Sequence, residues 1–189
     1  MVWGDSFKDD FYELKVAGLS RKIPKVRIHD ELTIASFVMF GDTELVEKCA
    51  DHLCEKLFTI EKCDYLVCPE AKAIPLTHAC ARILGVNYIV IRKSIKGYMS
   101  DPISEKVESI TTVGEQNLVL DRVDIDKIVG KNVAIIEDVV STGGTIASVE
   151  KLLDKVGANV VCRAAVLLEE AGYENPELIY LEKLPIFTS

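Results

Sequence analysis

Apolar side chains recur along the chain in two patterns. Residues 43–57 repeat them at helical spacing, and Asp42 directly before them suits a helix N-cap. Two further helices are predicted over about 75–84 and 144–155, each followed closely by a glycine that suits a helix end. Continuous runs of Val, Ile and Leu predict buried strands at 65–68, 88–91, 117–120, 133–136, 160–168 and 179–181.

This alternation of strands and helices predicts an α/β fold. Strands that are apolar on both faces are typical of a parallel sheet covered by helices on each side. The length of 189 residues fits one domain with a full core, whereas two domains would be cramped. Ligands bind at the carboxyl ends of such strands, so we expect the functional residues to follow Cys68, Ile91 and Ile136.

The stretch 94–116 interrupts the alternation. It is polar, and it is too long for a plain connection in a compact domain. Two interpretations stay open at this point: a disordered surface loop, or a flexible lid over an active site.

Charge and composition narrow the classes of function. The formal net charge is -8, and an acidic chain binds nucleic acid poorly because neutralising phosphates requires clustered Lys and Arg. No apolar run approaches the roughly 20 residues needed to span a bilayer, and the N-terminus carries no signal pattern. We therefore expect a cytoplasmic protein that binds neither nucleic acid nor membranes. The six cysteines form no CxxC pair and the three histidines lack metal-ligand spacing, so we expect no metal site built from side chains.

The most informative segment is 133–146, VAIIEDVVSTGGTI. An apolar strand leads to the adjacent acids Glu137 and Asp138, then to a loop rich in hydroxyl groups and glycine, and then to a helix. Backbone N–H groups at a helix start bind a phosphate, and glycines let the backbone approach it closely. The two acids would repel a phosphate but suit the hydroxyl groups of a sugar that carries one, so the segment indicates a ribose 5-phosphate site. The alternative is a capped turn with solvent-facing acids; GxxxxGK(S/T) and GxGxxG motifs are both missing.

This segment resembles the motif that binds 5-phosphoribosyl-1-pyrophosphate (PRPP) in the type I phosphoribosyltransferases. In addition, 68–76 resembles the pyrophosphate loop of the adenine-specific enzymes, and 90–93 resembles the family's strand ending in Arg-Lys. The resemblance covers roughly residues 10–185 and is closest to the adenine phosphoribosyltransferases of the purine branch. It implies a single-domain type I phosphoribosyltransferase fold, α/β, with a central, mainly parallel sheet flanked by helices. The core would span about 41–170, a small N-terminal hood about 1–40 with the C-terminal segment, and a flexible loop about 94–116.

The resemblance also implies roles for individual residues. Ribose hydroxyl groups would be bound by Glu137 and Asp138, and the 5-phosphate by Val140, Ser141, Thr142, Gly143, Gly144 and Thr145. Pyrophosphate would be held by Ala71, Lys72, Ala73, Arg92, Lys93 and Lys96. Mg²⁺ would be held mainly by substrate oxygens and water. Two departures from the family are Lys72, a point charge where Arg is usual, and Ala73, where Gly is usual.

The reaction implied by the family is displacement of pyrophosphate by a purine nitrogen, with adenine the favoured base and purine salvage the context. A loop carboxylate would help to deprotonate the base; Glu105 and Glu108 lie in the matching stretch, and we favour Glu108. Phe37 and Val38 are candidates for apolar walls around the base, although core packing is the commoner role of such side chains. The family further implies a homodimer.

Three alternatives remain. The base is xanthine, or hypoxanthine or guanine, in other purine enzymes of this family. A non-enzymatic regulator that senses PRPP would carry a DNA-binding domain ahead of this fold; we expect none, because the first elements lie close to the N-terminus and a basic recognition helix is missing. A PRPP synthase-like protein would need a longer chain with two such folds.

Overall fold

The computed structural model describes residues 10–58, 62–107 and 116–188. A parallel five-stranded sheet forms its centre, in the order β10-β9-β8-β4-β5. The strands are β4 (Tyr65–Pro69), β5 (Asn87–Ile91), β8 (Asn132–Val140), β9 (Asn159–Glu169) and β10 (Leu178–Leu184). The α/β class and the parallel central sheet predicted from the sequence are therefore confirmed.

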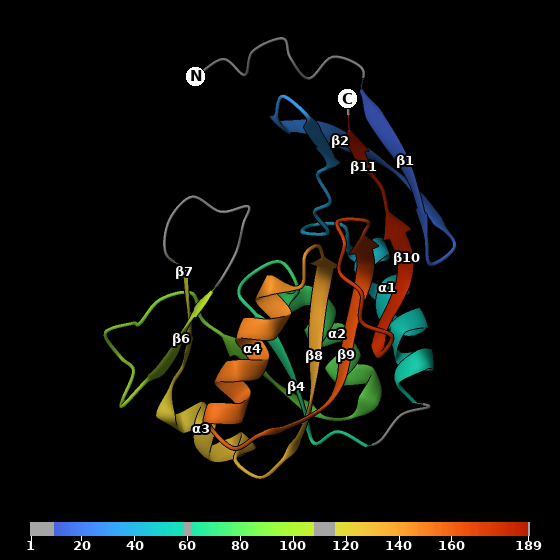
Figure 1. Ribbon diagram of the computed structural model, residues 1–189. Coiled ribbons are helices and arrows are strands. Elements are labelled where there is room, and N and C mark those ends of the chain that lie inside the picture. Colours follow the sequence, from blue (N-terminus) through green and yellow to red (C-terminus); the bar gives the residue numbers. More distant parts are fainter. Residues whose placement is uncertain (1–9, 59–61, 108–115, 189) are drawn as a thin grey trace.

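Helices cover both faces of this sheet (Figure 1), with α1 (Thr43–Leu57) and α2 (Ile74–Leu84) on one face, α3 (Arg122–Ile128) and α4 (Gly144–Lys155) on the other. Alternate residues of β8 explain the two layers: Ala134 and Ile136 pack with α1 and α2, whereas Val133 and Ile135 pack with α3 and α4. The predicted helix 43–57 is confirmed, with the Asp42 side chain accepting a hydrogen bond from the backbone N–H of Leu45.

An antiparallel sheet of four strands, β1-β2-β3-β11, forms the hood. Its strands are β1 (Phe11–Val16), β2 (Leu19–His29), β3 (Leu32–Ala35) and β11 (Ile186–Thr188). Figure 1 shows the hood above the carboxyl ends of the central strands, so any ligand bound at those ends lies beneath it.

The polar stretch after β5 contains a two-stranded antiparallel ribbon of β6 (Ile103–Val107) and β7 (Gln116–Leu120). The sequence predicted a strand at 117–120 but assigned it to the main series of strands; the structure pairs it with β6, a strand that was not predicted. A backbone bridge between Arg92 and Val119 joins the ribbon to the end of β5. Residues 108–115 of the expected flexible loop lie outside the described residues.

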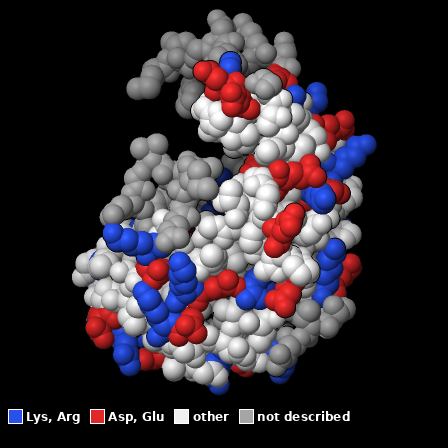
Figure 2. Space-filling model, viewed as in Figure 1, with Lys and Arg blue, Asp and Glu red and all other residues white. Residues whose placement is uncertain are grey.

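Acidic and basic side chains are interspersed over the visible face of the molecule (Figure 2). Neighbouring charges of opposite sign therefore offset one another on this face, instead of forming a broad patch of one sign. Within the described residues, no helix is long and apolar enough to cross a membrane.

The strand order creates a crevice between β4 and β8. The chain leaves β4 toward β5 in one direction and leaves β8 toward β9 in the other, so the connections diverge where these two neighbours end. Ligands bind at such a switch point in open α/β sheets. The residues following β4 and those near the end of β8 are therefore brought to the same place.

Candidate active site

The paired acids Glu137 and Asp138 lie near the carboxyl end of β8 and are only 7% and 5% exposed. The sequence predicted that the strand would end at Ile136, but β8 continues to Val140 because its last residues pair with β9 as far as Leu168. Among the described residues, Asp138 Oδ2 is a buried oxygen without a hydrogen-bond partner. Buried polar atoms are nearly always paired, so this oxygen points to a group that the protein itself does not supply.

Burial also changes the titration of both acids. It raises the pKa of Glu137 well above its ordinary value, an effect increased by the neighbouring charge of Asp138. Burial raises the pKa of Asp138 as well, and the positive charges of Lys72 and Lys93 partly offset the shift. The two lysines are thus close enough to the acids to act on them electrostatically, and a cation or hydroxyl donor bound here would favour the ionised carboxylates.

The segment after the acids forms a cradle at the start of α4, lined by Glu137 and residues 139–146; we call it the α4 cradle. Gly143 is the N-cap of α4 and has a φ of 81°, a conformation that favours glycine. Because this N-cap has no side chain to accept from the first N–H groups of the helix, those groups stay available to an anion. The predicted phosphate residues, Val140, Ser141, Thr142, Gly143, Gly144 and Thr145, all line this cradle.

A second cavity, which we call the central pocket, adjoins the α4 cradle and shares Glu137, Val139 and Thr145 with it. Its other lining residues come from the end of β4 and the turn after it, the segment after β5, the ribbon and β8: Pro69, Glu70, Ala71, Lys72, Lys93, Val107, Leu118 and Asp138. The Glu70–Ala71 peptide bond at its wall is cis. The pocket thus combines three acids, two lysines and backbone groups, which together can hold an anion beside a polyhydroxyl group.

The structure separates the predicted pyrophosphate residues into two groups. Ala71, Lys72 and Lys93 line the central pocket. Ala73 is instead the N-cap of α2 with a φ of -78°, so the turn does not need the glycine that is usual in the family. Arg92 pairs with Glu70, and the Lys96 ammonium donates to Ser94 Oγ at 2.6 Å. Neither of these two side chains is among the described residues lining the pocket.

The structure also distinguishes between the two candidates for the base-binding wall and between the two candidate loop acids. Phe37 is 3% exposed and belongs to the core, whereas Val38 is 47% exposed between the hood and the core. Glu105 forms an ion pair with Lys155 at the C-terminal end of α4, the opposite end from the cradle. Glu108 lies outside the described residues. The structure thus gives Glu105 an ion-pair partner at the far end of α4, and the role of Glu108 stays a prediction.

Comparison with known proteins identifies the family. A sequence model described as the phosphoribosyl transferase domain matches residues 39–184. The chain belongs to this family. The resemblance noted in the sequence is thereby confirmed, and the α4 cradle and central pocket lie within the matched part of this phosphoribosyltransferase chain.

Curated relatives of the phosphoribosyltransferase chain differ in the base that their names give. HGPRTase-like protein 3 of Haloterrigena turkmenica is 32% identical over 84% of this chain and 73% of its own. Adenine phosphoribosyltransferase of Thermosipho africanus is 36% identical over 73% of this chain and 76% of its own. Hypoxanthine/guanine phosphoribosyltransferase of Methanothermus fervidus is 36% identical over 65% of this chain, and the match spans only 61% of that relative.

Solved structures show the same fold. Adenine phosphoribosyltransferase from Thermoanaerobacter pseudethanolicus superposes with a TM-score of 0.68 at 22% identity, covering 85% of this chain and 95% of that one. Adenine phosphoribosyltransferase from Rhodothermus marinus superposes with a TM-score of 0.63 at 20% identity, covering 95% of this chain and 97% of that one. At these identities the likeness shows the fold of this phosphoribosyltransferase.

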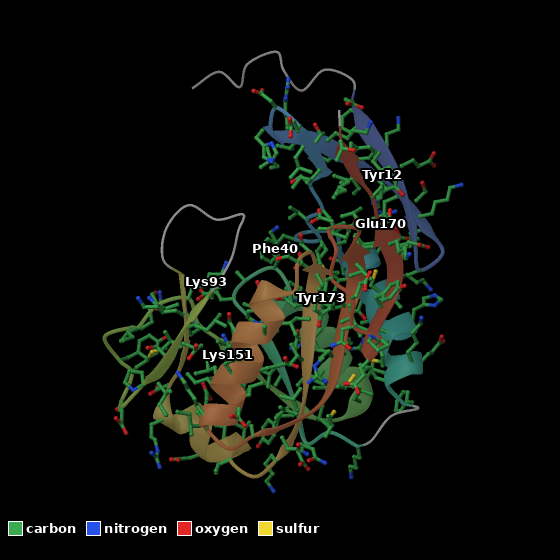
Figure 3. The ribbon with its side chains drawn as sticks, in the orientation of Figure 1. Tyr12, Phe40, Lys93, Lys151, Glu170 and Tyr173 are labelled. Atoms are coloured by element: carbon green, nitrogen blue, oxygen red, sulfur yellow. The ribbon has the colours of Figure 1, made fainter. Side chains whose placement is uncertain are left out.

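Two features of the site were missed from the sequence. Val107 and Leu118 line the central pocket from β6 and β7, which were not predicted to meet. Tyr173, from the connection between β9 and β10, lies beside the start of α4 (Figure 3). No local motif marks either contact, since each depends on segments far apart in the sequence.

Proposed function

We propose that this protein is a purine phosphoribosyltransferase that transfers the phosphoribosyl group of PRPP to adenine, giving AMP and pyrophosphate in purine salvage. The observation that carries the proposal is the buried, unpartnered Asp138 Oδ2 directly beside the α4 cradle. A phosphate in the cradle and a sugar hydroxyl group on this oxygen satisfy both features with one ligand.

In this proposal one PRPP molecule spans the two adjoining cavities. Its 5-phosphate occupies the α4 cradle, and its ribose hydroxyl groups donate to Glu137 and Asp138. Its pyrophosphate lies in the central pocket, where Lys72, Lys93 and the backbone around Ala71 bind it. The acids and the lysines therefore act on different parts of the same substrate.

The residues present fit Mg²⁺ as a companion of PRPP. Glu137 and Asp138 offer carboxylate oxygens, the donors that Mg²⁺ prefers. In the described parts of the chain, no group of three or more His, Cys, Asp or Glu side chains is arranged to hold a metal ion. Such a site suits an ion that takes most of its ligands from substrate oxygens and water, and bound Mg²⁺ supplies charge neutralisation for the pyrophosphate.

In the reaction, the bond from the anomeric carbon to pyrophosphate breaks and a bond to a purine nitrogen forms, with inversion at that carbon. Lys72 and Lys93 stabilise the negative charge that develops on pyrophosphate, while the cradle and the two acids hold the sugar in place. Glu108 accepts the proton from the attacking purine.

The base lies beneath the hood in this proposal, and Val38, which follows the hood strand β3 along the chain, is exposed and available for apolar contact. The principal alternative is a base carrying an oxygen at position 6, because the chain matches curated relatives named for hypoxanthine and guanine in addition to relatives named for adenine.

We further propose that the protein is a homodimer and acts in the cytoplasm. The six cysteines are all free, which suits a reducing compartment. Light scattering tests whether the protein is a dimer.

One assay tests the function. The full chain is incubated with PRPP and Mg²⁺ together with adenine, guanine, hypoxanthine, xanthine or a pyrimidine, and pyrophosphate release is measured. We expect release with adenine and its loss on chelation of Mg²⁺. If pyrophosphate is released only with an oxopurine, that base and not adenine is the substrate. If PRPP binds but no base causes pyrophosphate release, a PRPP-sensing regulator is favoured.

A further inference from the structure

The aromatic ring of Tyr173 lies directly against the backbone of Gly143. A methyl group at Gly143 would lie 2.1 Å from Cδ2 and 2.2 Å from Cε2 of that ring. Such distances are far inside van der Waals contact, so only a glycine fits beneath the ring. The same residue has a φ of 81°, so Gly143 is required both by its conformation and by its neighbour.

Tyr173 is itself held in place by other contacts. Its hydroxyl oxygen accepts a hydrogen bond from Asn175 Nδ2 at 3.1 Å, and Asn175 Oδ1 accepts another from the backbone of Glu177. The ring also packs against the buried apolar cluster Val140, Ile146, Ala165 and Leu178. Two of these residues, Val140 and Ile146, belong to the α4 cradle, so ring and cradle share one small core.

The ring backs the cradle and does not line it. The described residues that line the α4 cradle are Glu137 and 139–146, and Tyr173 is not among them. Figure 3 shows Tyr173 beside the end of α4 at which the helix begins. The ring therefore contacts the loop on the side turned away from the anion, and any effect on binding acts through Gly143.

The α4 cradle must have an ordered helix start and, at the same time, backbone N–H groups that are free to bind an anion. A Ser, Thr or Asp N-cap would order the start of α4, but its side chain would take one of the N–H groups that an anion needs. A glycine N-cap leaves those groups available, yet glycine is the residue with the most conformational freedom to lose. Packing of an aromatic ring on the glycine orders the turn without consuming a single N–H group.

We propose that Tyr173 is a positioning residue that preorganises Gly143 and the first N–H groups of α4 for the phosphate. The proposal rests on the proposed function in one respect: the anion in the cradle is the 5-phosphate of PRPP. Preorganisation strengthens binding because less conformational entropy is lost when the ligand arrives.

The test compares three variants of the full chain: Tyr173→Ala, Tyr173→Phe and, as a matched control, Tyr180→Ala. Tyr180 is a partly buried aromatic packed on the same cluster, so its loss costs core contacts without touching the lining of the cradle. Binding of ribose 5-phosphate and of PRPP with Mg²⁺ is measured by calorimetry. Amide hydrogen exchange of residues 143–146 is followed in the free protein.

We expect Tyr173→Ala to weaken both ligands about tenfold, to raise the KM for PRPP without changing the KM for the base, and to speed exchange at 143–146. Tyr173→Phe should retain affinity, because the ring and not the hydroxyl group contacts Gly143. Tyr180→Ala should retain affinity and protection of 143–146. If Tyr173→Ala is unfolded, Tyr173→Leu takes its place, since it keeps apolar volume but lacks the flat ring.

Unchanged affinity in folded Tyr173→Ala, or an equal loss in Tyr180→Ala, would overturn the proposal. Wild-type protein that binds ribose 5-phosphate but releases no pyrophosphate with any base would overturn the proposed function and leave the role of Tyr173 standing. Wild-type protein that binds neither ligand would overturn both.

Discussion

Glu70 and Arg92 form an ion pair between the residues that follow β4 and β5, with Arg92 Nε donating to Glu70 Oε2 at 3.1 Å. The backbone N–H of Lys93 donates to the same oxygen at 3.0 Å. The Lys93 N–H, together with Arg92, holds the pKa of Glu70 below its ordinary value. These contacts tie the turn after β4 to the end of β5, and they leave the side chains of Lys72 and Lys93 to face the central pocket.

The first prediction separates the two neighbouring cations. Arg92→Ala should lower the free energy of unfolding by about 1 kcal/mol or less, because the pair is partly exposed. Lys93→Ala keeps the backbone bond to Glu70 and should leave stability unchanged, but it should weaken PRPP binding about tenfold by removing a charge-assisted contact. Denaturant titration and calorimetry measure the two effects. A larger loss of PRPP affinity in Arg92→Ala than in Lys93→Ala would contradict these assignments.

The second prediction concerns Asp138→Asn. Removing a buried charge whose Oδ2 has no hydrogen-bond partner should raise the free energy of unfolding of the ligand-free protein by about 1 kcal/mol, or roughly 2–4 °C in Tm. The same change should weaken PRPP binding about tenfold or more, because an amide is a poorer acceptor for a sugar hydroxyl group than a carboxylate. Melting curves with and without PRPP report both effects. A variant that is less stable without ligand would show that Asp138 has a structural role.

The third prediction is a pH dependence that Glu137→Gln removes. The folded-state pKa of Glu137 is raised, so the folded protein binds this proton more tightly than the unfolded chain does. Its contribution to stability is full below the unfolded pKa of about 4.3 and is lost as pH rises through the raised value.

Glu70 and Asp42 have lowered pKa values and act in the opposite direction, so the wild-type curve alone does not isolate Glu137. The difference in free energy of unfolding between wild type and Glu137→Gln does isolate the contribution of Glu137. Denaturant titrations across the pH range should therefore show the variant gaining stability relative to wild type as pH rises. If the difference in free energy of unfolding between the two proteins stays constant with pH, the pKa of Glu137 is not raised by burial and the prediction is wrong.

The sequence predicted those parts of the fold and site that depend on local patterns. The helix 43–57 was marked by its apolar spacing and by Asp42, and the α4 cradle by two acids followed by hydroxyl groups and glycines. Each of these signals lies within about fifteen consecutive residues. A short window therefore contains enough residues to predict that these features are present.

Features that depend on distant segments were missed or misassigned. The strand β6, Ile103–Val107, has three polar residues between two apolar ones, so no apolar pattern marks it; its pairing with β7 defines it. Phe37 and Val38 are both apolar, and only the packing of the hood against the core distinguishes the buried side chain from the exposed one. The partner of Gly143 is Tyr173, and no motif joins them. In each case the deciding contact is tertiary, so no local pattern encodes it.

The last prediction separates the two loop acids. The side chain of Glu105 pairs with Lys155, which lies about 16 Å along α4 from the cradle, given 1.5 Å of rise for each residue. Glu105→Gln should therefore leave kcat within about twofold of wild type and lower the free energy of unfolding by about 1 kcal/mol or less, because Lys155 is half exposed.

The matched variant Glu108→Gln should keep stability and the KM for PRPP, but lower kcat by about 100-fold, the usual contribution of a general base. Steady-state rates with adenine, measured beside melting curves, distinguish the two outcomes. Lys155→Gln serves as the control for the ion pair, since it should reproduce the stability change of Glu105→Gln. If Glu105→Gln lowers kcat and Lys155→Gln does not, Glu105 takes part in the reaction and this prediction is wrong.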